Sequence, residues 1–361
     1  MINQQPLLKW LEPIFNAPLG DLIDKKSIVL IEEGNSVILQ YPFPVGSIKG
    51  EILESLKNYL SEQVGPESNN AVSFDVVHKV KAHQVQQHLK PLLGIKNIIA
   101  VASGKGGVGK STTAVNLSLA LASEGANVGL LDADIYGPSI PTMLGLKNQK
   151  PDMTDDKKFI PLEKYSIKTN SIGFLIDEDQ PVVWRGPMVT QMLDQLIMQT
   201  QWGELDYLII DMPPGTGDTQ LTLSQRVPMA GAVIVTTPQD ISLLDAKRGL
   251  QMFNKVNIKI LGVVENMAAF VCPHCGEQSA IFGAEGGQQL ATDYDAKLLG
   301  SIPLTASIRE LTDVGKPSVI AEPDGPVASV YRELARTMLI KLSEAQRDYR
   351  SAFPNIVIEN T

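Results

Sequence analysis

The stretch of sequence that decides the fold reads Val101-Ala-Ser-Gly-Lys-Gly-Gly-Val-Gly-Lys-Ser-Thr112. It follows an apolar run and precedes a helix-forming segment, which predicts a strand, a glycine-rich loop and a helix. Residues 104–111 fit the spacing G-x-x-x-x-G-K-[ST], in which glycines let backbone N–H groups converge on phosphate oxygens. Lys110 then supplies a positive charge for the β- and γ-phosphates, and Ser111 a hydroxyl for Mg²⁺. The stretch therefore predicts a nucleotide-binding loop.

Beyond this loop, short apolar runs alternate with helical patterns, as a parallel sheet covered by helices requires. We expect an α/β fold with a mostly parallel sheet flanked by helices, and strands at 98–102, 128–132, 207–211, 231–236 and 260–265. Asp132 ends one of these runs, with Asp134 two residues later, and Asp211 ends another. Because ligands bind at the carboxyl ends of such strands, we expect Asp211 to hold Mg²⁺ through its water shell.

Composition narrows the class of protein. The 361 residues, 43% of them hydrophobic, suffice for one large domain and a small one. The formal charge of −9 gives no general attraction to nucleic acid or to anionic lipid, and we expect neither as a partner. No leader-like segment opens the sequence, and no run approaches about 18 apolar residues. Two cysteines are too few for a disulfide framework, so a cytoplasmic protein is expected.

Residues 1–93 are expected to form a small α+β domain and linker, followed by the nucleotide-binding domain at 94–361. Helical spacing at 7–15 and 45–64, with strand patterns at 27–32, 36–41 and 71–80, gives the order α-β-β-α-β. His78, His83 and His88 lie near the linker at steps of five residues, and such a step turns a helical side chain by about 140°. The three therefore do not share one face, and we expect solvated histidines rather than a metal site.

The two cysteines form the motif Cys272-Pro-His-Cys275 on the loop after the strand predicted at 260–265. Two thiolates at this spacing can bind one metal centre, but a tetrahedral zinc or a four-iron cluster needs four ligands. Two copies of the chain would supply four, which points to a symmetric dimer. An iron-sulfur cluster, a zinc ion shared across the dimer, a redox couple and inert thiols all remain open on the residues alone.

Lys105 is a second lysine inside the loop, which resembles the K-G-G-V-G-K-[ST] signature of the deviant Walker A P-loop ATPases. The resemblance implies a nucleotide-sandwich homodimer in which Lys105 reaches the nucleotide of the other copy. It also implies that Asp134 orients the attacking water and that Asn266 binds the base, which favours ATP. Catalysis is thus expected from Lys105, Lys110 and Asp134. The residues expected to bind nucleotide are Gly104, Lys105, Gly106, Gly107, Val108, Gly109, Lys110, Ser111, Thr112 and Asn266.

Further motifs match, in order, the Mrp/ApbC family of iron-sulfur cluster carrier ATPases. They are Trp184-Arg-Gly-Pro-Met188, Pro213-Pro-Gly-Thr-Gly-Asp218, Thr237-Pro-Gln-Asp240, Glu265-Asn-Met267, Cys272-Pro-His-Cys275 and Gly300-Ser-Ile-Pro303. The resemblance covers about residues 95–320. It implies a homodimer that binds a [4Fe-4S] cluster through Cys272 and Cys275, hydrolyses ATP slowly and hands the cluster to apoproteins.

The N-terminal region resembles a shortened, degenerate MIP18-like domain, which often precedes this type of ATPase. Asn16-Ala-Pro-Leu-Gly20 stands where that domain usually carries Asp-Pro-x-x-Gly, so the aspartate is missing. The resemblance therefore implies a role in docking or assembly rather than chemistry.

Two rival functions share parts of this pattern. A positioning or partitioning ATPase would have the loop, Lys105 and the switch segments, but it would not need Cys272 and Cys275 and would require a basic or amphipathic attachment surface. An electron donor like the nitrogenase iron protein spaces its cluster cysteines far apart in sequence, unlike the C-x-x-C motif of this chain.

Overall fold

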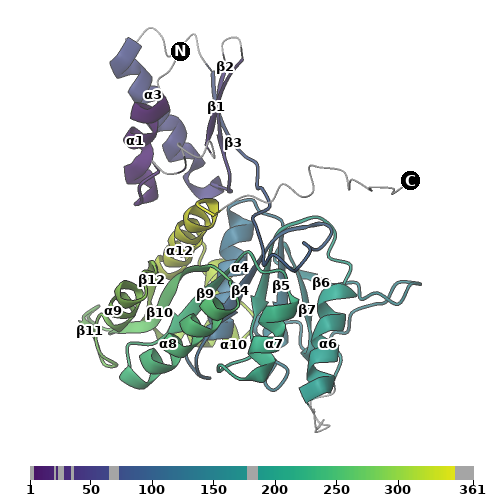
Figure 1. Cartoon of the computed structure of the whole chain (residues 1–361). Coiled ribbons are helices and arrows are strands. Elements are labelled where there is room, and N and C mark those ends of the chain that lie inside the picture. Colours follow the sequence, from purple (N-terminus) through teal and green to yellow (C-terminus); the bar gives the residue numbers. More distant parts are fainter. Residues whose placement is uncertain are drawn as a thin grey trace, which may run out of the picture.

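The computed structural model describes residues 4–19, 22, 28–33, 36–64, 73–176 and 186–345. Two sheets organise the chain: a large sheet covered by helices on both faces, and a small N-terminal sheet that lies beyond one end of it, as Figure 1 shows. The yellow C-terminal helix α12 (Pro326–Ser343) lies between the N-terminal part and the large sheet.

The large sheet has nine strands in the order β11-β10-β9-β4-β8-β5-β7-β6, with β12 also paired to β10. Among the described strand pairs of this large sheet, only β6–β7 and β10–β11 are antiparallel. Its strands are β4 (Ile95–Ala102), β5 (Val128–Asp132), β6 (Leu162–Lys164), β7 (Ile167–Ser171), β8 (Leu205–Asp211), β9 (Gly231–Thr236), β10 (Ile260–Val271), β11 (Gln278–Ser279) and β12 (Leu298–Leu304). The predicted α/β fold with a mostly parallel sheet is confirmed.

The central strands are buried on both faces, and their side chains alternate between two cores. In β4, Ile99 and Val101 belong to one core, whereas Ile98 and Ala100 belong to the other. This period of two is what a strand imposes on successive side chains. The helices of this part of the chain are α4 (Lys110–Ser123), α5 (Ile140–Met143), η3 (Ile172–Phe174), α6 (Gly186–Met198), α7 (Asp218–Arg226), α8 (Asp240–Lys255), α9 (Gly286–Asp293), α10 (Ala306–Asp313), α11 (Ser318–Ala321) and α12.

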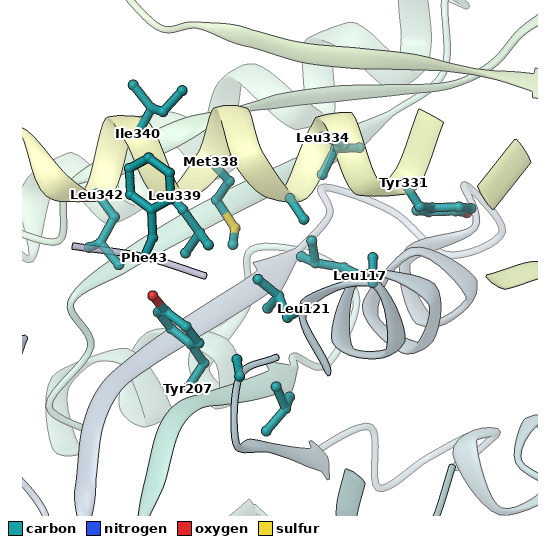
Figure 2. Packing of buried hydrophobic residues seen from close by; sticks show 14 of the residues in the cluster. Phe43, Leu117, Leu121, Tyr207, Tyr331, Leu334, Met338, Leu339, Ile340 and Leu342 are labelled. Atoms are coloured by element: carbon teal, nitrogen blue, oxygen red, sulfur yellow. The ribbon is translucent and has the colours of Figure 1, made fainter. Parts of the chain in front are cut away.

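One face is covered by α4 and α12, and the other by α6, α7 and α8. In Figure 2, Met338 and Leu339 of α12 extend toward Leu121 of α4 and Tyr207 of β8. Tyr207 is fully buried there, and burial raises its pKa well above the ordinary value. The helix that starts at the nucleotide-binding loop is therefore packed along its length.

The N-terminal part follows the predicted order α-β-β-α-β. It contains α1 (Gln4–Phe15), β1 (Val29–Glu33), β2 (Ser36–Tyr41), η1 (Gly46–Ile48), α3 (Lys49–Val64) and β3 (Ser73–His78). Strands β1 and β2 are antiparallel, and β2 and β3 are parallel. Its apolar core is continuous with the core formed by α4 and α12, and Phe43 lies beside α12 in Figure 2.

Hydrogen-bonded polar side chains also join the N-terminal part to helices α4 and α12. Glu124, directly after α4, is 1% exposed and accepts hydrogen bonds from the Ser47 backbone N–H and hydroxyl of η1. Arg336 of α12 donates to Glu124 Oε1 at 3.0 Å and to Ser47 Oγ at 3.1 Å. We call Ser47, Glu124 and Arg336 the interdomain clamp.

The expectation of three solvated histidines was wrong for His83. Its side chain is 3% exposed, and Nδ1 lies 2.9 Å from Asn97 Oδ1 at the start of β4. The segment after β3 packs against the large sheet, and Gln86 is buried there as well, with bonds to Ser224 and Val227 carbonyls. His78 and His88 are exposed, as expected.

Among the described helices, none is both long and apolar enough to cross a membrane. Of the motif at 184–188, only residues 186–188 lie within the described part of the chain.

Candidate functional site: a nucleotide-binding loop beside a cysteine turn

The loop between β4 and α4 wraps around a cavity at the carboxyl edge of the sheet. Gly107 and Gly109 have φ values of 80° and 82°, which L side chains rarely adopt. A Cβ on Gly104 would lie 2.1 Å from the backbone carbon of Asp245 in α8, so a side chain does not fit there. The cavity has a volume of about 190 Å³ and is lined by Ser103, Lys105, Gly106, Gly107, Gly109, Lys110, Ser111, Thr112, Asp134, Met143 and Pro214.

Lys110 is the centre of charge in this cavity. Its side chain is 6% exposed, and Nζ lies 2.6 Å from Asp211 Oδ1 and 3.7 Å from Asp134 Oδ2. Ser111 Oγ lies 3.4 Å from the same nitrogen. Because β4, β5 and β8 are parallel neighbours, the ends of these strands bring the loop lysine and both aspartates together, as the sequence predicted.

The carboxylates outnumber the lysine. Burial raises the pKa of Asp211 and of Asp134, while the Lys110 ammonium opposes the rise in both. Burial, followed by the charge of Asp211, raises the pKa of Asp132 to about 7. When Asp134 and Asp211 are both ionised, their two negative charges exceed the one ammonium that contacts them, which favours a bound cation.

The donor set fits Mg²⁺. Asp211 is fully buried, and its Oδ2 has no hydrogen-bond partner among the residues that the structure describes. Ser111 offers a hydroxyl oxygen from the first turn of α4. Mg²⁺ prefers such hard oxygen donors and keeps several of its waters.

Asp132 organises the loop that carries Asp134. Its Oδ1 accepts the Asp134 backbone N–H at 3.1 Å, and its Oδ2 accepts the Ile140 N–H at 3.2 Å and the Ser171 hydroxyl at 3.0 Å. From the sequence alone, Asp132 is only the last residue of a predicted strand. Ser171 lies 39 residues away, and no local pattern connects it to this loop.

Lys105 lines the cavity with a half-buried side chain, and within the described part of the chain it forms no ion pair. The Pro213–Asp218 motif borders the same space: Pro214 lines the cavity, and the Gly215 N–H donates to the Ser103 carbonyl at 3.0 Å. Gly215 has a φ of 91°, so this turn depends on glycine.

Asn266 of β10 touches the nucleotide-binding loop from the side. It is 8% exposed, its Nδ2 donates to the Val108 carbonyl at 2.9 Å, and its Oδ1 accepts the Met267 N–H at 3.0 Å. A Cβ on Gly109 would lie 2.0 Å from Nδ2. The side chain expected at the base is thus bonded to the loop itself.

Cys272 and Cys275 lie in a tight turn immediately after β10. The Cys272 N–H donates to the Glu277 carbonyl and the Gly276 N–H to the Cys272 carbonyl, both at 2.9 Å. Backbone N–H groups of Cys275 and then His274 point at the Cys272 sulfur and lower the pKa of its thiol. Both cysteines are free, Cys275 is exposed, and in the described ranges no group of three or more His, Cys, Asp or Glu side chains could hold a metal ion.

Comparison with known proteins shows which sequences and structures this chain resembles. Residues 94–339 match the family model described as NUBPL iron-transfer P-loop NTPase. An "Iron-sulfur cluster carrier protein" of Pseudomonas fragi is 57% identical over 72% of this chain and 90% of its own length. A protein of the same description from Escherichia coli strain K12 is 49% identical over 85% of this chain and 82% of its own. A nucleotide-binding protein from Archaeoglobus fulgidus, solved in complex with ADP, aligns with a TM-score of 0.56 and 38% identity over 65% of this chain and 91% of that one.

Proposed function

This chain belongs to the NUBPL iron-transfer P-loop NTPase family, and we propose that it is an ATP-dependent carrier of iron-sulfur clusters. The cysteine turn is the observation that carries the proposal. Its backbone N–H groups stabilise the Cys272 thiolate, the form of cysteine that binds iron. The relatives from Pseudomonas fragi and Escherichia coli carry the same function in their names.

Nucleotide hydrolysis is the general activity of P-loop NTPases, and we assign its steps to the residues around Lys110. Lys110 neutralises charge on the β- and γ-phosphates, and Asp134, 3.7 Å from its ammonium, orients the attacking water. When bound, Mg²⁺ would neutralise phosphate charge, and Ser111 and Asp211 would be the residues that bind it. ATP is the proposed nucleotide.

A homodimer follows from the count of thiolates. Each chain offers Cys272 and Cys275, and a [4Fe-4S] cluster takes four cysteines. We propose that two copies each supply one turn and that Lys105 contacts the nucleotide of the other copy. The cluster would be cargo, passed on to apoproteins. We also propose that the protein is cytoplasmic, because both cysteines are free, as is usual in a reducing compartment.

The test is anaerobic reconstitution of the full chain with iron and sulfide. We expect about four irons and four sulfides per dimer, and a dimer by light scattering. Cys272→Ala and Cys275→Ala should bind almost no iron while retaining most ATP hydrolysis. His274→Ala is the matched control, because its exposed side chain lies in the same turn and it should load normally.

Two outcomes would contradict the proposal. Stoichiometric zinc without sulfide would assign the turn to a structural zinc site shared by two chains. Unchanged iron in both cysteine variants would show that the cluster is held elsewhere. A positioning ATPase, the remaining alternative, would bind membranes or DNA in its ATP state and would not depend on the cysteines.

A further inference from the structure

Strand β10 connects the two chemistries of the molecule. Asn266, near its middle, is bonded to the nucleotide-binding loop, and the strand ends at Val271, directly before the cysteine turn. Cys272 is therefore the sixth residue after the one that contacts the loop.

The Asn266 side chain packs closely against the loop. Nδ2 is 2.9 Å from the Val108 carbonyl, and the space where a Gly109 Cβ would lie is filled by the same nitrogen. A shift of the peptide between Val108 and Gly109 must therefore move Asn266 or break the hydrogen bond. The loop and the side chain on β10 are therefore linked by a direct contact.

On strand β10, Asn266 lies between a segment that is hydrogen-bonded to neighbouring elements and a segment in which the strand changes direction. Glu265, one residue earlier, is 4% exposed and accepts the Gly287 N–H at 2.7 Å and the Ser301 hydroxyl at 3.2 Å, which anchors it to α9 and β12. Directly after Asn266, Met267 has a φ of 57°, and the register with β12 is interrupted until Phe270.

Oδ1 of Asn266 accepts the N–H of this left-handed Met267 at 3.0 Å. The Asn266 amide thus forms a hydrogen bond to the loop through Nδ2 and a second one to the bend of the strand through Oδ1. Beyond the bend, Phe270 and Val271 pair with β11, and this short hairpin presents the cysteines.

We propose that Asn266 is a positioning residue that transmits the state of the nucleotide-binding loop to the cysteine turn. The proposal rests on the proposed function, because the turn is taken to hold the cluster. It assigns Asn266 to coupling two sites, through the bonds to the loop and to Met267 that the structure shows.

The first test needs no cluster. Hydrogen exchange of residues 267–279 is measured in the full chain with and without a saturating non-hydrolysable ATP analogue and Mg²⁺. We expect the nucleotide to slow exchange by about five-fold or more in the wild type, and by less than about two-fold in Asn266→Ala and in the isosteric Asn266→Asp. Ser301→Ala, which removes a hydrogen bond to neighbouring Glu265 without touching the loop, should behave as the wild type.

The second test measures the affinity for the same analogue before and after cluster loading. The two affinities should differ by about five-fold or more in the wild type and agree in Asn266→Ala. Protection of residues 267–279 that persists in both Asn266 variants would overturn the inference, as would its absence from the wild type. A loss of the preference for ATP over GTP analogues by about ten-fold in Asn266→Ala, with protection retained, would reassign the residue to the base.

These results separate the two proposals. A wild type that loads no iron contradicts the carrier function, whereas the exchange experiment still decides the link between loop and turn. A wild type that loads normally, with coupling unchanged in Asn266→Ala, contradicts the inference alone.

Discussion

Arg336→Met should loosen the attachment of the N-terminal part to the nucleotide-binding part. Methionine preserves much of the apolar stem but removes both hydrogen bonds of the guanidinium, to Glu124 and to Ser47. The Glu124 carboxylate is 1% exposed, so it would remain buried without its counter-ion.

The cost follows from these contacts. Removing one partner of a buried ion pair costs about 3–5 kcal/mol. Glu124 keeps two donors from Ser47, which places the expected loss at the lower end, about 3 kcal/mol. Urea unfolding of the full chain measures it, and the midpoint should fall by up to about 1 M.

Two further variants make this test decisive. Arg309→Met breaks an exposed ion pair with Asp313 and should change the free energy of unfolding by about 0.5 kcal/mol or less. Glu124→Gln combined with Arg336→Met removes the unpaired charge and should cost less than the two single changes added together. An Arg336→Met midpoint within error of the wild type would refute a stabilising role for the interdomain clamp.

Three predictions concern the site. Lys110→Ala should abolish ATP hydrolysis, whereas Lys105→Ala should suppress turnover yet leave more nucleotide binding; near-normal turnover in Lys105→Ala would exclude a role across the dimer. The Asp134→Asn variant should bind Mg²⁺-ATP but hydrolyse it far more slowly in a steady-state assay. If the variant no longer binds Mg²⁺-ATP, Asp134 is a ligand of the metal instead. Without Mg²⁺ and nucleotide, the wild type should lose stability as pH rises from about 4 to 7, because the unfolded chain releases the Asp132 proton that the folded chain retains. Asp132→Asn should flatten this slope in urea midpoints measured at several pH values, and an unchanged slope would contradict the raised pKa of Asp132.

The strands that line the site could be predicted because they are buried on both faces. The ranges of β5 and β9 agree with the prediction to the residue, and the apolar runs of β4 and β8 identified those strands. The short β6–β7 hairpin was missed because Leu162–Lys164 and Ile167–Ser171 alternate weakly with polar residues. Strand β12 was missed as well, because glycine and proline interrupt its apolar pattern.

The site was predictable where its chemistry is local in sequence. Lys110 and Ser111 belong to one motif, and Asp134 and Asp211 follow apolar strands that end at the same edge. The contacts of Asp132 with Ser171 and of His83 with Asn97 join distant segments, so no spacing could indicate them.

Asn266 shows how a motif can predict a residue's importance but not its contacts. An amide at the end of a strand suits base recognition because it both donates and accepts. In the folded chain, one N–H of Nδ2 donates to the Val108 carbonyl and one lone pair of Oδ1 accepts the Met267 N–H, so a second N–H and a second lone pair remain for another partner. A base that met this remaining N–H and lone pair would contact the same amide that joins the loop to the bend of the strand. Removing the amide in Asn266→Ala should therefore disturb the loop and the cysteine turn together, which the exchange experiment measures.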